Sequence, residues 1–114
     1  MADLTPAWQE HERVARGVPQ VMRGTLGAFF TPRDVALRVA TEVLQRFPHG
    51  TVPVILDPAC GAGALLLGAL EYSMKERPSW VAPLLGGKLH GWEIERGIAE
   101  GARHVLQEIG RAHV

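Results

Sequence analysis

The chain has 114 residues, with 12 basic and 12 acidic side chains and a formal net charge of zero. Such neutrality gives no sign of a strongly basic nucleic-acid surface, and 46% hydrophobic residues suit a folded globular chain and argue against disorder. The single cysteine, Cys60, excludes an internal disulfide framework and is typical of a reducing compartment, and no apolar run reaches the roughly 18 residues of a membrane span. We expect a cytoplasmic, soluble domain or a piece of one.

The first predicted element is a short polar helix over residues 5–16, with Thr5 as its expected N-cap and Pro6 in its first turn. The stretch "RGVPQVMRGTLG" that follows contains several glycines and a proline, which predicts a loop. Residues 1–22 therefore form an N-terminal helix and loop ahead of the main domain, residues 23–114.

A second helix is predicted at "TPRD", where Thr31 is the expected N-cap, Pro32 suits the first helical position and Asp34 completes a variant of the capping box. Apolar residues then recur at helical spacing up to Pro48 and should form one stripe. These residues are Val35, Ala36, Val39, Ala40, Val43, Leu44 and Phe47.

The run "VPVIL" is continuously apolar and rich in branched residues, which predicts a strand buried on both faces. A helix then extends to about Lys75, residues 78–88 form a loop or irregular turn, and "LHGWEI" is a second short strand. The alternation of helices and strands predicts two parallel strands joined by a right-handed crossover. A last helix ends near Gly110, with Ile98, Ala102, Val105, Leu106 and Ile109 on one side.

Acidic residues stand at the carboxyl ends of both predicted strands, Asp57 after the first and Glu93 after the second. Ligands of open α/β sheets bind at this edge, and Gly61 and Gly63 allow a ligand to approach the backbone of the first turn. A carboxylate at position 93 can accept two hydrogen bonds from the vicinal hydroxyls of a ribose. The pattern therefore indicates a ribose-bearing ligand.

Two common nucleotide motifs do not fit this turn. The dinucleotide fingerprint requires a third glycine where this chain has Leu66, and an acid about 20 residues further on, whereas Glu93 lies 30 positions beyond Gly63. A P-loop requires a Gly-Lys-Ser/Thr sequence, which does not follow the turn.

The stretch "ILDPACGAG" resembles the cofactor motif of S-adenosyl-L-methionine (SAM)-dependent methyltransferases. With "GAFFTPRDVA" before it and "LHGWEIERGIAEGA" after it, the chain is similar to adenine-N6 DNA methyltransferases, which include type I modification subunits and fused restriction–modification enzymes. The resemblance implies an α/β chain with a partial Rossmann-like methyltransferase fold. N-terminal helices would precede the β-α-β-α part of a doubly wound parallel sheet, and residues 23–114 would form an incomplete SAM-binding domain.

The resemblance also implies a set of cofactor contacts. The start of the second helix would receive the methionine carboxylate, because helix N–H groups favour an anion. The glycine turn would give the cofactor backbone room, and the acid after the second strand would hold its ribose. The implied residues are Phe30, Thr31 and Pro32 for the methionine end, Asp57, Ala59, Cys60, Gly61 and Gly63 for the turn, and Glu93 and Ile94 for the nucleoside.

Methyl transfer in this family also needs an Asn/Asp-Pro-Pro-aromatic motif, which holds a target adenine swung out of the duplex. The sequence contains neither asparagine nor a Pro-Pro pair, so no catalytic residue is assigned. We expect no methyl transfer by this chain alone, and contact with DNA through regions outside it. It would be a truncated reading frame, one half of a split enzyme or a fragment, with the remaining part or a specificity subunit as its partner and no membrane contact.

Other interpretations remain open from the residues alone. Thr31 and Pro32 suit a plain helix cap, and Cys60 suits a small residue filling a tight turn better than a reactive thiol. The five histidines show no metal-ligand spacing, so no metal site is expected. Two strands would leave an open sheet edge. The alternative functions are therefore a SAM-dependent RNA or protein methyltransferase fragment, or a non-catalytic remnant acting as an interaction module.

Overall fold

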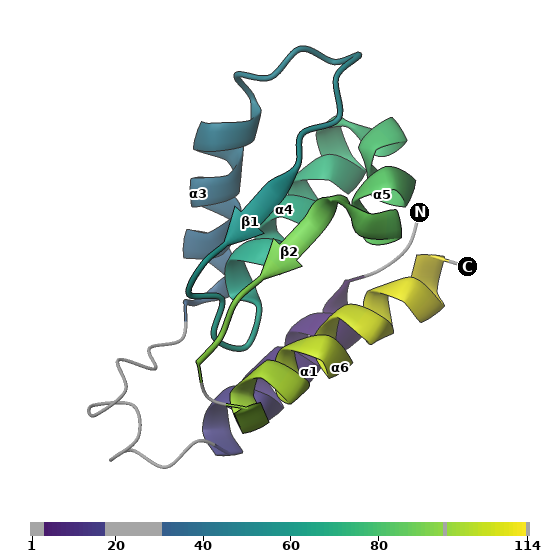
Figure 1. Ribbon diagram of the computed structural model, residues 1–114. Helices are drawn as coiled ribbons and strands as arrows, with labels where there is room; N and C mark the ends of the chain where they lie inside the picture. Colours follow the sequence, from purple (N-terminus) through teal and green to yellow (C-terminus); the bar gives the residue numbers. More distant parts are fainter. Residues whose placement is uncertain (1–3, 18–30, 95, 114) are drawn as a thin grey trace.

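The computed structural model describes residues 4–17, 31–94 and 96–113 of the chain (Figure 1). Helices dominate it, and they accompany a small sheet of two strands. The elements in chain order are α1 (Thr5–Gly17), α3 (Arg33–Leu44), β1 (Ile55–Asp57), α4 (Ala64–Glu76), η1 (Pro78–Trp80), α5 (Val81–Pro83), η2 (Leu84–Lys88), β2 (Leu89–Gly91) and α6 (Arg96–His113).

The helix predicted over residues 5–16 is confirmed as α1, and the loop or irregular turn predicted for residues 78–88 consists of the short helical turns η1, α5 and η2. The loop predicted after the first helix lies mostly outside the described residues, as does Phe30. None of the described helices is both long enough and apolar enough to cross a membrane.

The two strands are parallel, as the order of elements predicts. Ile55 of β1 is in register with Leu89 of β2, and Asp57 is in register with Gly91. Both strands are shorter than predicted, and each has three residues. Their carboxyl ends therefore meet at one edge, from which the glycine turn and the segment leading to α6 depart (Figure 1).

The core is centred on α4, which is buried along almost its whole length. Helix α3 packs closely against it at Gly68, where an added Cβ would lie 2.6 Å from the carbonyl oxygen of Ala36. Helix α1 runs along α6 (Figure 1). The predicted inner side of the last helix is confirmed, because Ile98, Ala102, Val105 and Ile109 are buried and Leu106 is half-buried against the core.

The prediction that the first strand is buried on both faces is wrong. Ile55 and Leu89 pack against the core, but Leu56 is 45% exposed and Val54 is 66% exposed. In Figure 1, α4 passes behind β1 and β2, and no described helix covers their near face. A parallel sheet is normally covered on both faces, and here the described part of the chain covers only one.

Two predictions for α3 are also wrong. The N-cap of the helix is Pro32 and not Thr31, and no side chain makes a capping hydrogen bond to the first turn. The apolar stripe is divided lengthwise: Ala36, Ala40 and Leu44 are buried against α4, while the side of the helix that carries Val39 and Val43 is exposed. Helical periodicity marks which residues share a side but does not show whether anything covers them.

Candidate functional site

The turn after β1 has the tight backbone that its sequence predicts. Gly61 and Gly63 both have positive φ angles, 54° and 92°, which residues with a Cβ rarely adopt. The Asp57 carboxylate accepts a hydrogen bond from the Ala59 N–H at 3.1 Å, and the Cys60 carbonyl accepts one from the Gly63 N–H at 2.8 Å. Asp57 therefore holds the start of the turn in place.

Backbone hydrogen bonds join this turn to the end of β2. The Trp92 N–H donates to the Asp57 carbonyl at 2.9 Å, and the Trp92 carbonyl accepts from the Cys60 N–H at 2.9 Å. Gly91 makes this approach possible, since a Cβ there would lie 2.8 Å from the Cys60 sulfur. The acid that follows, Glu93, is consequently brought to the glycine turn.

Both acids lie near enough to Cys60 to affect the pKa of its thiol. Burial raises the pKa of the Cys60 thiol to about 11, with further upward contributions from the carboxylates of Asp57 and then Glu93. The thiol is buried beside Leu66 and Ala102, as expected for a small residue that fills a turn. A protonated, buried thiol is inert, so the chemistry of this edge depends on the two carboxylates and the backbone.

The residues on either side of Glu93 in the sequence are large, apolar and exposed. Glu93 is half-buried, whereas Trp92 is 63% exposed and Ile94 is 89% exposed. Large exposed apolar side chains beside a carboxylate can contact the flat face of a base while the acid accepts hydrogen bonds from hydroxyl groups. The residues that surround this edge therefore fit a nucleoside.

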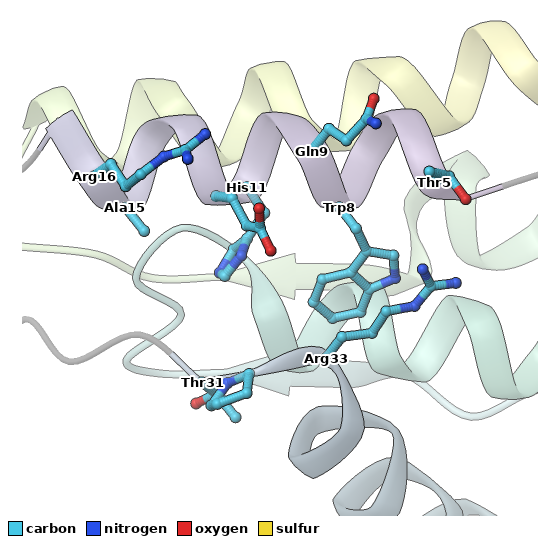
Figure 2. Close-up of a pocket in the computed structure, with 10 residues that line it drawn as sticks. Thr5, Trp8, Gln9, His11, Ala15, Arg16, Thr31 and Arg33 are labelled. Atoms are coloured by element: carbon cyan, nitrogen blue, oxygen red, sulfur yellow. The ribbon is translucent and has the colours of Figure 1, made fainter.

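The predicted contacts of the methionine end lie at the start of α3. Thr31 is half-buried and Pro32 is exposed, and both line a cavity of about 450 Å³ between α1 and α3 (Figure 2). None of the other predicted site residues that the structure describes lines this cavity. In Figure 1 the start of α3 lies at the same end of the sheet as the glycine turn and the end of β2.

Two residues of this cavity were not identified from the sequence. His11 points from α1 toward Thr31 (Figure 2), and burial lowers its pKa from 6.5, opposed by the nearby Glu12. Trp8 is also buried, and its ring packs edge-on against His11. Their spacing of three residues places them on one side of α1, but the polar composition of that helix gave no sign of the buried side.

An ion pair that the sequence does not reveal fixes the start of α3. The Arg33 guanidinium donates to the buried carboxylate of Glu71 on α4 at 2.9 Å and lies 5.6 Å from the centre of the Trp8 ring. With the close contact at Gly68, this pair sets the position of α3 relative to the helix that leaves the glycine turn. These are positioning residues, and no local motif marks them.

The described residues contain no group of three or more histidine, cysteine, aspartate or glutamate side chains able to hold a metal ion.

Comparison with known proteins adds an independent observation. The family described as N-6 DNA Methylase matches residues 12–99. The type I restriction enzyme MpnII methylase subunit of Mycoplasma pneumoniae (strain ATCC 29342 / M129 / Subtype 1) is 41% identical over 59 residues, which cover 49% of this chain and 10% of that protein. The chain thus spans about a tenth of this curated relative. No solved structure matches the chain.

Proposed function

Because this chain belongs to the N-6 DNA methylase family, we propose that it forms the SAM-binding part of an enzyme that methylates adenine N6 in DNA. The observation that carries the proposal is the meeting of Asp57 and Glu93 at one sheet edge, through the hydrogen bonds between the glycine turn and Trp92. The relative's name supports a place in a restriction–modification system. A cytoplasmic location and a partial Rossmann-like methyltransferase fold are part of the same proposal.

Each part of the cofactor has a proposed neighbour. Glu93 accepts hydrogen bonds from the ribose hydroxyls, Ile94 contacts the adenine, and Asp57 orders the turn and faces the amino group of the cofactor. The backbone of the glycine turn lets the cofactor approach closely at Ala59, Cys60, Gly61 and Gly63. Thr31 and Pro32, with Phe30 before them, contact the methionine end, where the start of α3 favours its carboxylate.

When bound, SAM supplies an electrophilic methyl group, and this chain supplies its binding and orientation. The adenine-holding Asn/Asp-Pro-Pro-aromatic motif is not in the sequence, so the acceptor base must be held by other polypeptide. We therefore propose that the chain alone transfers no methyl group. DNA would be contacted through that other polypeptide, with a specificity subunit as a further partner.

Isothermal titration calorimetry with SAM tests this proposal. Replacing Glu93 by alanine removes charge-assisted hydrogen bonds to the ribose, so binding should weaken by about 1–3 kcal/mol, or roughly 5- to 150-fold. Glu76→Ala is the matched control, because Glu76 is an exposed acid at the opposite end of α4 from the turn. An equal affinity of the Glu93→Ala variant and the parent chain would remove Glu93 from the site. If the folded parent chain does not bind millimolar SAM, the proposed function is wrong.

A further inference from the structure

Arg77, the residue that follows α4, is a buried cation. It is 9% exposed, and its guanidinium carbon lies 5.7 Å from the centre of the Tyr72 ring and 5.5 Å from that of Trp80. Trp80 is itself fixed, because its indole N–H donates to the carbonyl of His49 at 3.2 Å. Among the described residues, no acid lies within ion-pair distance of Arg77. Buried charges are normally paired, so this one is an exception.

The hydrogen bonds of the Arg77 guanidinium occupy one side of the group. Its Nη1 donates to the carbonyl of Glu76 at 3.0 Å. Its Nε is buried and has no acceptor among the described residues, and Nη2 donates to none of them. The carbonyl end of α4 offsets part of the positive charge, but it supplies no acceptor for the Nε–H. A buried donor without an acceptor is unfavourable, so the Nε side of Arg77 is suited to receive one.

Arg33 shows what this side of a guanidinium binds in the same molecule. Both Nε and Nη2 of Arg33 donate to the buried carboxylate of Glu71. These two donors form a planar fork that matches the geometry of a carboxylate. Arg77 is buried and carries the same fork, but without such an acid.

A cavity of about 350 Å³ adjoins Arg77, between α3 and the end of α4. Leu37 and Tyr72 supply apolar surface to its wall. Lys75 and Glu76 also line it, but both are exposed, and their opposite charges largely cancel in water. The guanidinium of Arg77 therefore remains as the uncompensated charge of the cavity, which favours a ligand with a single negative charge.

We propose that this cavity binds the carboxylate of a small organic acid. The carboxylate accepts hydrogen bonds from Nε and Nη2 of Arg77, and the apolar part of the acid contacts Leu37 and Tyr72. Because the 13 residues of α4, about 20 Å of helix, separate Arg77 from the glycine turn, this site is distinct from the one proposed for SAM. The acid is either a free molecule or a glutamate or aspartate side chain of another polypeptide, since both present the same group.

NMR titration of the full, ¹⁵N-labelled chain with butyrate tests the proposal. The Nε–H signal of Arg77 should move downfield and give a Kd of about 1–10 mM, the range for so small a ligand. Butyramide has the same shape without the charge, so it should bind at least about ten times more weakly. A capped Ala-Glu-Ala peptide distinguishes the two sources: tighter binding than butyrate indicates a polypeptide side chain, and weaker binding indicates a free acid.

A substitution at position 77 tests the role of the fork. Arg77→Lys keeps the positive charge but removes the fork, so butyrate binding should weaken at least about tenfold. Arg38→Lys is the matched control, because Arg38 is exposed on α3 outside the cavity, and it should change the affinity less than about twofold. Circular dichroism establishes that both variants are folded. If Arg77→Lys does not fold, the Nε–H signal of the parent chain still decides between butyrate and butyramide.

Three results would overturn the proposal. One is an Arg77 Nε–H signal that does not move at about 100 mM butyrate, at constant ionic strength. Another is an equal response to butyrate and butyramide, because the site would then not select a carboxylate. The third is a folded Arg77→Lys variant that binds butyrate as tightly as the parent chain.

Discussion

Replacing Gly68 by alanine tests whether the packing of α3 on α4 holds the start of α3 in position relative to the glycine turn. The added Cβ would lie 2.6 Å from the carbonyl oxygen and 2.8 Å from the carbonyl carbon of Ala36. Both atoms belong to the backbone of α3, so relief requires the whole helix to move. Overpacking of this kind costs about 1–3 kcal/mol, and better helix propensity returns at most about 1 kcal/mol. We expect a net loss of about 1–2 kcal/mol in the free energy of unfolding.

Urea and thermal denaturation, followed by circular dichroism, measure this loss. The midpoint temperature should fall by at least about 4 °C. Gly86→Ala is the control, because an added Cβ there meets no atom within 4 Å, and it should leave stability unchanged or raise it by up to about 1 kcal/mol.

Gly68→Ala should also weaken SAM binding, because Thr31 lies directly before the displaced α3. A Gly68→Ala variant as stable as the Gly86→Ala control would refute the close packing of α3 on α4. Lower stability with unchanged SAM affinity would refute only the link between that packing and the cofactor site.

Three further outcomes follow from burial and charge. Arg33→Ala should lower the free energy of unfolding, measured by urea denaturation, by about 1–3 kcal/mol, because it leaves the buried Glu71 carboxylate unpaired. A smaller loss would mean that water replaces the guanidinium. Burial lowers the pKa of His11, so the unfolded chain binds the extra proton and stability falls as the pH drops below about 6.5. His11→Gln should lessen this loss of stability at low pH, whereas the same substitution at the exposed His90 should not. With its pKa raised to about 11, Cys60 should react with a disulfide reagent at pH 8 at least about 100 times more slowly than in the urea-unfolded chain; equal rates would contradict its burial.

The sequence by itself determined the features that depend on neighbouring residues. Positive φ angles at Gly61 and Gly63 follow from the need for glycine in a strand-to-helix turn, and the parallel pairing of β1 with β2 follows from the helix between them. The meeting of Asp57 with Glu93 also follows, because parallel strands end at the same edge of a sheet. These properties are fixed by covalent order and local backbone geometry.

Only the tertiary structure decided which apolar residues are covered. Val43 and Leu44 are adjacent in α3 and equally apolar in sequence, yet one is exposed and the other buried, since α4 packs on a single side of that helix. Burial of His11 and the pairing of Arg33 with Glu71 depend on residues that are distant along the chain. Periodicity shows which side chains share a face, whereas the layers packed against that face decide whether it is core or a surface for a partner.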